Sequence, residues 1–336
     1  MYDLTGEKVI AAGLGKSGEA VVRTALALGA RASAWDRKRR EELDPVLLRE
    51  LETAGVELYL GGDEPKGEFH VAVLSPGLPP GLPVFAGLER EGAEIIGELE
   101  FAFRAGKGRY AAITGTNGKT TTTALTGEMF RRAGMPAEVV GNIGLPASAR
   151  SPFAAEDTWL VTEVSSFQLE TVKSFRPEVS ALLNLTPDHM DRHGTMENYG
   201  NIKARIFENQ RSGDYFVVNR DDPKAWALAS GCRAKIAPFS RLAELEFGAC
   251  MKDGSLVIRD ETGRVTRLCE AGELKIPGLH NLENALAAAA VAYFAGVFPG
   301  AISDALRGFT GVPHRLERVG TVNGVHFVND SKGTNP

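Results

Sequence analysis

The residues with the clearest chemistry form the segment TGTNGKTT at positions 114–121. Its glycines let successive backbone amides face an anion, and a helix that follows adds the partial positive charge of its first turn. Lys119 supplies a full charge for terminal phosphates, and the hydroxyl of Thr120 or Thr121 can ligate Mg²⁺. We therefore predict that the phosphates of a nucleotide are bound by Gly115, Thr116, Asn117, Gly118, Lys119, Thr120 and Thr121.

An ordinary Gly-rich turn is the alternative for this segment. The pattern GxxxxGK followed by Ser or Thr is met imperfectly, because Ile113 stands where the first glycine would be. However, the segment lies between an apolar run at 109–114, which we expect to be a strand, and a stretch to about Ala133, which we expect to be a helix. This context coincides with the lysine and the hydroxyls, so phosphate binding is favoured.

A second Gly-rich turn, GLGKSG at 13–18, follows the apolar run at 8–14, and Asp36 stands about twenty residues on, at the end of the next expected strand. In a dinucleotide-binding fold such an acidic residue grips a ribose, so this weak pattern alone suggests a nicotinamide or flavin enzyme. The site for nucleotide phosphates predicted at 115–121 is interpreted as an ATP site, and an ATP site favours a UDP-bearing substrate over a redox cofactor at this turn. A dinucleotide oxidoreductase stays a distant alternative.

Candidate metal ligands lie at the ends of two further expected strands. Glu163 closes the strand expected at 159–163, where a carboxylate suits Mg²⁺. His189 follows the strand expected at 179–184, in a loop crowded with Asp and His residues. A solvated strand end and a surface loop are the alternatives. From its pattern alone, Lys203 is an exposed helix lysine.

A pair of asparagines begins an Ala-rich helix that we expect at 281–294. Asn281 and Asn284 lie one turn apart, so their side chains share one face of the helix. Such a face can contact a ligand, although helix capping is an equal alternative for Asn281.

Apolar runs that alternate with helical stretches must position these residues, and the alternation predicts parallel sheets covered by helices. Residues 247–268 break it with Asp-Gly and Thr-Gly turns, which predict a small antiparallel excursion. We therefore predict an α/β fold with a Rossmann-like domain at 1–97, a central P-loop NTPase-like α/β domain at 98–311 that contains the excursion, and the start of a third α/β domain at 312–336.

Composition and charge narrow the class of protein. A length of 336 residues favours more than one domain, and 43% hydrophobic with 24% charged residues is typical of a soluble globular chain. The net charge of -5 argues against nucleic-acid binding, which needs a basic surface. The three cysteines are widely spaced and are expected to be reduced and structural. Without a signal peptide or a long apolar stretch, we expect a cytoplasmic monomer with no membrane insertion.

The segment TGTNGKTTT at 114–122 resembles the phosphate loop of the Mur ligase and folylpolyglutamate synthetase superfamily. Three further segments, GLGKSG, GNIGLP at 141–146 and EVSSFQLE at 163–170, resemble the branch that adds D-glutamate to UDP-N-acetylmuramoyl-L-alanine. NLTPDHMDRHG, GLHNLENAL, PHRLE and NDSKGTN then follow in the family's order. The resemblance covers the whole chain and implies an amide ligase of peptidoglycan precursor synthesis that uses ATP and Mg²⁺.

The resemblance also implies roles for individual residues. Catalysis is implied for Lys119, Glu163, His189 and Lys203, and Lys203 is expected to be a carbamate that holds Mg²⁺ together with Thr120, Glu163 and His189. Contacts to ATP are implied for Asn281, Asn284, Arg315, Asp330 and Lys332. Contacts to the UDP-sugar substrate are implied for Gly15, Lys16, Ser17, Asp36, Arg37, Ser75, Gly77, Asn142, Ser165 and His189.

In the implied reaction, the carboxylate of the UDP-sugar substrate attacks the γ-phosphate of ATP, and the amine of D-glutamate then displaces phosphate from the acyl phosphate. The family continues with a C-terminal domain beyond the position of Pro336, so we expect this chain to bind the UDP-sugar and to ligate poorly. The alternatives are a related Mur ligase that adds another amino acid and a non-catalytic UDP-sugar-binding fragment.

Overall fold

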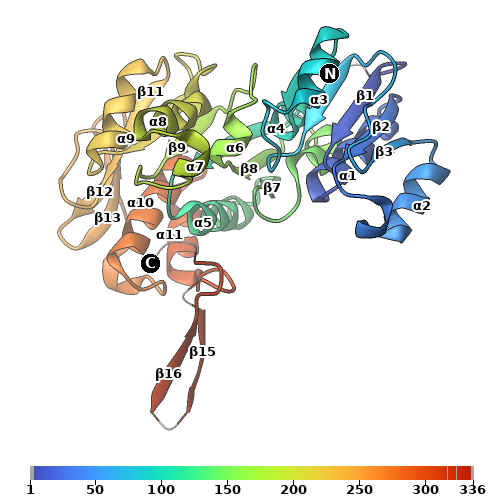
Figure 1. Ribbon diagram of the computed structural model, residues 1–336. Coiled ribbons are helices and arrows are strands. Elements are labelled where there is room, and N and C mark those ends of the chain that lie inside the picture. Colours follow the sequence, from blue (N-terminus) through green and yellow to red (C-terminus); the bar gives the residue numbers. More distant parts are fainter. Residues whose placement is uncertain (1–3, 316, 323, 334–336) are drawn as a thin grey trace. The chain divides into compact units, whose positions relative to one another are not determined.

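The computed structural model describes residues 4–315, 317–322 and 324–333 (Figure 1). The chain divides into two compact units, Met1–Tyr110 with Val140–Arg176, and Ala111–Val139 with Pro177–Pro336. These units follow the density of contacts within the chain. The domain boundaries predicted after residues 97 and 311 stay a prediction.

The first unit contains a five-stranded parallel sheet in the order β3-β2-β1-β4-β5. Its strands are β1 (Lys8–Ala12), β2 (Arg31–Asp36), β3 (Glu57–Leu60), β4 (Val71–Leu74) and β5 (Glu94–Gly97). Val9 enters one hydrophobic cluster and the next residue, Ile10, enters another, because side chains alternate across the strand. This doubly wound order confirms the predicted Rossmann-like class.

The helices of the first unit are α1 (Lys16–Ala27), α2 (Pro45–Thr53), α3 (Pro83–Arg90), α4 (Glu98–Ala105) and α6 (Ser166–Leu169). Helix α2 begins at Pro45, whose missing amide costs nothing there, and the Asp44 carboxylate caps it by accepting a 2.8 Å hydrogen bond from the Val46 amide. The strand, turn and helix predicted at the start of the chain are confirmed. Strand β5 was not predicted, because its EIIG run is short.

A larger sheet has nine strands in the order β14-β13-β12-β11-β10-β9-β6-β8-β7. It comprises β6 (Arg109–Thr114), β7 (Ala137–Gly141), β8 (Trp159–Glu163), β9 (Val179–Leu182), β10 (Tyr215–Asn219), β11 (Lys235–Ser240), β12 (Gly248–Lys252), β13 (Ser255–Arg259) and β14 (Val265–Glu270). Pairing is parallel from β6 through β9, β10 and β11 to β12. Strands β12, β13 and β14 pair antiparallel, which confirms the predicted excursion.

The helices of the second unit are α5 (Lys119–Arg132), α7 (Met190–His193), α8 (Met196–Ala204), α9 (Pro223–Leu228), α10 (Leu279–Phe294) and α11 (Pro299–Gly308). Helix α10 packs against α5, and its residues 284–292 are buried. Most of these side chains are alanines, so the two helices can approach closely. Short 3-10 helices in the chain span Arg40–Glu42, Ala147–Ala149, Ser151–Phe153, Arg205–Phe207, Ala229–Gly231 and Ala271–Glu273.

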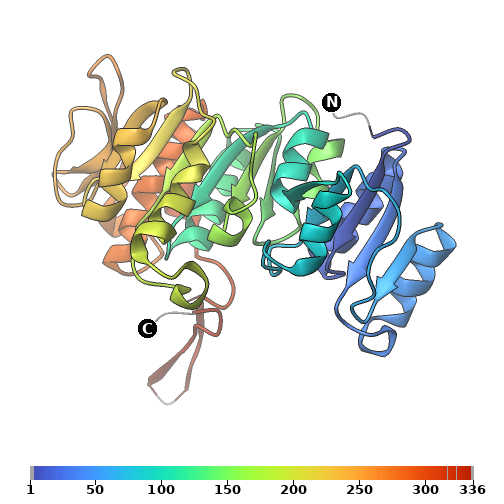
Figure 2. The ribbon, with the colours of Figure 1, turned by 45° about the horizontal axis from the view of Figure 1, so that its top comes forward.

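The second unit also carries a β-hairpin, β15 (Glu317–Val322) and β16 (Val325–Asn329), which extends away from the rest of the unit (Figures 1 and 2). The hairpin exposes more than half the surface of each of five apolar side chains, Val319, Val322, Val325, Phe327 and Val328. Within the described residues, no helix has both the length and the apolar character needed to cross a membrane.

The three cysteines are free, and two of them are buried in the antiparallel part of the larger sheet. Cys250 lies on β12 and Cys269 on β14. Burial raises the pKa of the Cys269 thiol to about 11, which makes the reactive thiolate form scarce near neutral pH. These cysteines therefore fit the structural role that was predicted for them.

Candidate functional site

The predicted phosphate loop connects β6 to α5 in the second unit. Gly118 is the N-cap of α5 and has a φ of 83°, in the left-handed region that favours glycine. The first intrahelical hydrogen bond runs from the Thr122 amide to the Gly118 carbonyl oxygen, 3.0 Å away. The amides of residues 118–121 therefore stand at the start of this helix, and the amides of a helix N-terminus are the kind of donor group that binds anions.

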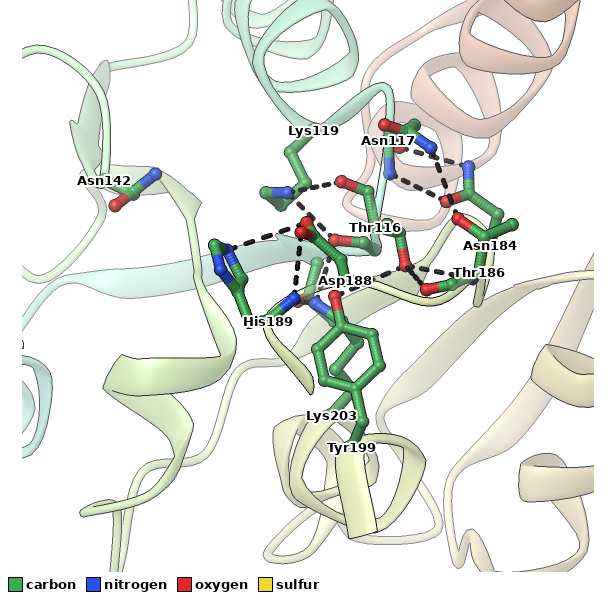
Figure 3. Close-up of polar contacts among 12 residues, drawn as sticks. Thr116, Asn117, Lys119, Asn142, Asn184, Thr186, Asp188, His189, Tyr199 and Lys203 are labelled. Atoms are coloured by element: carbon green, nitrogen blue, oxygen red, sulfur yellow. Dashed lines mark hydrogen bonds and ion pairs between the residues drawn. The ribbon is translucent and has the colours of Figure 1, made fainter. Parts of the chain in front are cut away.

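Two lysines direct their ammonium groups at one carbonyl oxygen of this loop (Figure 3). Nζ of Lys119 donates to the Gly115 and Thr116 carbonyl oxygens at 3.0 and 2.8 Å. Nζ of Lys203 donates to the same Gly115 oxygen at 2.9 Å and to Oγ1 of Thr114 at 3.4 Å. Both nitrogens thus lie beside the loop, where they concentrate positive charge.

Lys203 is only 1% exposed, so the interpretation of its sequence pattern as an exposed helix lysine was wrong. Helix α8 turns Tyr199, Gly200 and Lys203 inward. Tyr199 lies one turn before Lys203, and its ring sits 4.8 Å below the ammonium nitrogen. Its hydroxyl is 3.3 Å from Oγ1 of Thr116, and burial raises its pKa, while Asp188 acts in the same direction. Tyr199 therefore joins α8 to the phosphate loop.

Residues 183–186 run beside the loop and are hydrogen-bonded to it (Figure 3), and we call this segment the brace. The parallel ladder of β6 and β9 continues past its last pair, because the Leu183 amide donates to the Thr114 oxygen at 3.0 Å. The Asn184 side chain then accepts from the Asn117 amide at 2.8 Å and donates to the Asn117 oxygen at 3.1 Å. The loop therefore has a defined shape before any ligand binds.

A threonine pair extends the brace. Oγ1 of Thr116 donates to the Thr186 oxygen at 3.1 Å and accepts from the Thr186 amide at 3.1 Å. Neither Asn184 nor Thr186 was predicted as a site residue, nor was Tyr199. The only signal for the first two was their position in the segment NLTPDHMDRHG, which carries the family resemblance.

The brace is itself fastened to the end of β10. Nδ2 of Asn219 donates to the Leu183 oxygen at 2.9 Å in a buried contact. One oxygen of Asp222 accepts from the Leu185 amide at 2.8 Å, while the other caps α9 by accepting from the first amides of that helix. A continuous series of hydrogen bonds therefore links the phosphate loop to the segments at the ends of β6, β9 and β10.

His189 is the N-cap of the short helix α7, and its φ of 52° is unusual for a residue other than glycine. Its amide donates to Oδ1 of Asp188 at 3.0 Å, and its Nε2 lies 3.6 Å from Oδ2 of the same carboxylate. The ring is about half exposed. Across the described part of the chain, no group of three His, Cys, Asp or Glu residues is arranged to hold a metal ion.

Asn281 and Asn284 lie against the N-terminus of α5. Nδ2 of Asn281 donates to the Pro277 oxygen at 2.7 Å, and Nδ2 of Asn284 donates to Oδ1 of Asn281 at 3.1 Å. Helix α10 has Gly278 as its N-cap, so the capping interpretation of Asn281 was wrong. The Asn284 oxygen lies so near Gly118 that a Cβ atom at that position would overlap it.

The predicted ATP contacts of the hairpin region lie around its base. Arg315 precedes β15, and Asp330 and Lys332 follow β16. The Lys332 amide donates to the His314 oxygen at 3.2 Å. The Nε atom of Arg315 is buried without a hydrogen-bond partner among the described residues. A role for these residues toward ATP stays a prediction.

The Gly-rich turn of the first unit is closed by two of the predicted residues. Oγ of Ser75 donates to the Gly13 oxygen at 2.9 Å, and the Asp36 carboxylate accepts from the amides of Leu14 and Lys38 at 2.6 and 2.8 Å. A Cβ atom at Gly18 would overlap the Gly13 oxygen. The predicted residues Gly15, Lys16 and Ser17 begin α1 at this turn, and Arg37 and Gly77 are exposed nearby in the chain.

Glu163 ends β8 and is only 1% exposed, so the alternative of a solvated strand end was wrong. Its Oε1 accepts from Nδ2 of Asn142 at 2.7 Å, whereas its Oε2 has no hydrogen-bond partner among the described residues. The Asn142 amide donates to the Glu163 carbonyl oxygen at 2.9 Å. Ser165, the third predicted residue here, caps α6 by accepting from the Gln168 amide.

Comparison with known proteins identifies the family. Residues 113–292 match the Mur ligase middle domain. The chain is 47% identical over 99% of its length to UDP-N-acetylmuramoylalanine–D-glutamate ligase of Thermoanaerobacter sp. (strain X514) and spans 74% of that protein. It is 49% identical to the ligase of the same name from Caldanaerobacter subterraneus subsp. tengcongensis, of which it spans 73%.

Solved structures share the fold. UDP-N-acetylmuramate:L-alanyl-gamma-D-glutamyl-meso-diaminopimelate ligase from Neisseria meningitides matches with a TM-score of 0.61 at 20% identity, over 92% of this chain and 99% of that one. UDP-N-acetylmuramate-alanine ligase from Thermotoga maritima matches with a TM-score of 0.57 at 20% identity, over 96% of this chain and 74% of that one. The match to the middle domain and the relatives at 47% and 49% identity show that the chain belongs to the Mur ligase family.

Proposed function

We propose that the chain is an ATP-dependent ligase that joins D-glutamate to UDP-N-acetylmuramoyl-L-alanine in peptidoglycan precursor synthesis. The proposal is supported by the relatives at 47% and 49% identity, which carry the name of that activity and align with nearly the whole chain. The observation that carries it is the loop at 115–121, where the N-terminus of α5, Lys119 and Lys203 come together. Such a loop suits the phosphates of ATP.

In the reaction, the protein must bring two anions together. The substrate carboxylate attacks the γ-phosphorus of ATP, the bond to ADP breaks, and an acyl phosphate forms. The amine of D-glutamate then attacks the acyl carbon, and phosphate leaves. Lys119 would follow the charge on the transferred phosphoryl group, and the amides of residues 118–121 would hold the phosphate oxygens in line.

The second unit offers further contacts to ATP. Asn281 and Asn284 lie against the start of α5 and would meet the adenine, which needs donors and acceptors on its edge. Arg315, Asp330 and Lys332 would approach from the base of the hairpin. These assignments come from the family resemblance.

Magnesium fits the residues predicted to hold it. Oε2 of Glu163 is a buried carboxylate oxygen without a partner among the described residues, and a hard cation satisfies such an atom well. In the second unit, Thr120 lies in the first turn of α5, His189 is the N-cap of α7, and Lys203 lies on α8. When bound, Mg²⁺ would neutralise charge on the phosphates.

Lys203 would contribute as a carbamate. The ammonium would first lose a proton to solvent. The lone pair of the neutral amine would then attack CO₂, forming an N–C bond as one C=O π bond breaks, and a second proton would leave the nitrogen, so that the loss of two protons turns a cation into an anion. Lys203 is only 1% exposed, so the carbamate would lie in a site sheltered from bulk solvent. ¹³C NMR of protein equilibrated with ¹³C-bicarbonate should show a carbamate carbon that is absent from Lys203→Ala, and no such signal would contradict the assignment.

The UDP-sugar would bind the first unit. The Gly-rich turn presents the amides of Gly15, Lys16 and Ser17, and Ser75 and Asp36 hold that turn closed. Arg37 and Gly77 would complete the nucleotide contacts, and Asn142 and Ser165 those to the sugar end. The family resemblance also implies a substrate contact for His189, which belongs to the second unit. Equilibrium binding of UDP-N-acetylmuramoyl-L-alanine to single alanine variants of Lys16, Arg37 and Asn142 tests this placement.

Lys119→Ala tests the function as a whole. Calorimetry should find Mg-ATP affinity lower by at least about tenfold, since a hydrogen bond to a charged group contributes roughly 1.5–3 kcal/mol. Lys235→Ala is the matched control, because Lys235 is an exposed lysine of the same unit that pairs with Glu261. Undiminished Mg-ATP affinity in Lys119→Ala would overturn the proposal.

Turnover and specificity need a second assay. Phosphate release with D-glutamate measures ligation by these 336 residues, which span 74% of the first relative, and the expectation of poor turnover stays a prediction. A screen of amino acids separates the proposed ligase from one that adds another residue. Binding of the UDP-sugar without ATP binding would favour the non-catalytic alternative. The monomeric state and the cytoplasmic location also stay predictions, and size-exclusion chromatography checks the first.

A further inference from the structure

Glu98 is a buried carboxyl group that the proposed reaction does not use. It begins helix α4 and is only 1% exposed. Its Oε1 accepts from the Ser148 amide at 2.7 Å and from the Ser148 hydroxyl at 2.6 Å. Its Oε2 has no hydrogen-bond partner among the described residues. A carboxyl placed in this way needs an explanation, because burial without full pairing is costly.

The contacts of Glu98 fix the end of the segment that carries Asn142. Ser148 follows GNIGLP in the chain and is completely buried. Its amide and hydroxyl are bound by Glu98, and its carbonyl oxygen accepts a 2.8 Å hydrogen bond from Oγ1 of Thr24 on α1. All of its polar groups are therefore engaged, and the segment 141–148 is held at this point.

On its other side, Glu98 meets the segment that carries Glu163. Burial raises the pKa of Glu98, and the nearby Gln168 side chain is one of the groups that oppose this shift. Oε1 of Gln168 accepts from the amide and hydroxyl of Ser165 at 2.9 and 3.0 Å. Ser165 caps α6 directly after β8, which ends at Glu163. The hydrogen bond between Asn142 and Glu163 joins the same two segments at their other ends.

We propose that Glu98 is a positioning residue that holds segments 141–148 and 163–168 together and so keeps Asn142 directed at Glu163. The proposal rests on the proposed function, in which these two side chains meet the substrate and the metal. All the residues involved lie in the first unit. The clamp is the set of contacts that Glu98 makes with these two segments. Without it, Asn142 and Glu163 should still be present, but the distance between their side chains should vary more.

A neutral carboxyl group would perform this task best. Burial raises the pKa of Glu98, although the hydrogen bonds from Ser148 oppose the shift. Glu100, two residues further on, is also buried, but donors from residues 173–175 and Arg104 outweigh burial and lower its pKa. Two glutamates on one helix thus have pKa values shifted in opposite directions because they differ in donors. In the neutral form, Oε2 of Glu98 carries the proton, so glutamine has nearly the same shape and hydrogen-bonding pattern.

The test compares Glu98→Gln with Glu98→Ala in calorimetry with UDP-N-acetylmuramoyl-L-alanine. We expect the glutamine variant to bind within about twofold of the wild type and the alanine variant about tenfold more weakly, as expected from the loss of two buried hydrogen bonds. Circular dichroism and thermal unfolding establish that each variant is folded. Equal weakening in both variants would overturn the proposal, as would wild-type affinity in the folded alanine variant.

Two further variants keep the test decisive if Glu98→Ala does not fold. Ser148→Ala removes one of the two donors and should weaken binding by about threefold, and unchanged binding would count against the clamp. Glu100→Gln is the matched control, since it should lower thermal stability without changing the affinity of the folded protein. Absence of binding by the wild type would instead overturn the proposed function, so the two failures are distinguishable.

Discussion

Two Gly-rich turns in this chain follow the same plan of strand, turn and helix, yet their surroundings differ. In the first, at 13–18, the Leu14 amide donates to the Asp36 carboxylate. In the second, at 115–121, the Asn117 amide donates to the neutral side chain of Asn184, and two ammonium groups lie on the Gly115 oxygen. The first turn is closed by a carboxylate, whereas the second has two lysine nitrogens on one of its carbonyl oxygens.

The difference shows that glycine spacing alone does not define a phosphate site. Both turns offer the amides of a helix N-terminus, which attract anions by a modest amount. The neighbouring side chains then decide how much negative charge each turn accepts. These neighbours are remote in sequence, because Asp36 is 22 residues from Leu14 and Lys203 is 88 residues from Gly115. Four substitutions test this comparison, and they are ordered here by expected effect.

Gly18→Ala should be the most damaging change. The added Cβ atom would overlap the Gly13 carbonyl oxygen. The Cβ atom is bonded directly to the backbone and the oxygen is part of it, so neither can rotate away. We expect a loss of about 3 kcal/mol in the free energy of unfolding, at the upper end for overpacking, measured by urea denaturation. A variant as stable as the wild type would show that the first turn is not closely packed.

Gly118→Ala should impair the second turn with a different signature. The left-handed backbone costs a residue with a Cβ about 1–2 kcal/mol, and the Asn284 side chain would have to move. We expect Mg-ATP affinity to fall by about tenfold while UDP affinity is unchanged, as measured by calorimetry. Equal losses for both ligands would indicate general unfolding and would break the comparison.

Asn184→Ala should make the shape of the phosphate loop less defined, although Asn184 is not one of the residues predicted to contact the ligand. Two hydrogen bonds to the Asn117 backbone would be lost, each worth about 1 kcal/mol, although water can replace part of them. We expect about fivefold weaker Mg-ATP binding and unchanged binding of adenosine, which lacks phosphates. If adenosine binding weakens equally, the brace serves the whole nucleotide site and not the loop.

Gly15→Ala should have the smallest effect. Its φ of -80° suits any residue, and no atom lies within 4 Å of the added Cβ. Lower entropy of the unfolded chain would roughly offset the poorer N-cap, so stability should stay within about 1 kcal/mol. Thermal unfolding beside Gly18→Ala checks this. A large loss in Gly15→Ala would mean that this position is more crowded than the structure shows.

Much of the fold followed from the pattern of apolar runs, and the exceptions have physical reasons. The phosphate loop, its flanking strand and helix, and the antiparallel excursion were all predicted and are found. Strands β5 and β7 were not predicted. Their short runs, EIIG and AEVVG, contain too few apolar residues to signal a strand, and they form one only because a neighbouring strand supplies hydrogen bonds.

The site was less predictable than the fold. The family resemblance identified Lys203, but the burial of this lysine is set by how α8 packs, and helix periodicity gave no sign of it. Asn184 and Tyr199 were missed for a related reason. Their partners are 67 and 83 residues away, so no local spacing could connect them with Asn117 and Thr116.

The carbonyl oxygen of Gly115 has two donors where one would suffice. When a phosphate enters the loop, Lys119 can leave this oxygen and follow the incoming charge, while the Lys203 nitrogen keeps it satisfied. A carbamate at Lys203 would retain one N–H, so this holds in either chemical state of that side chain. In the proposed function, the second donor would keep this oxygen hydrogen-bonded while Lys119 turned to the phosphate, and it would so lower the desolvation cost of nucleotide entry.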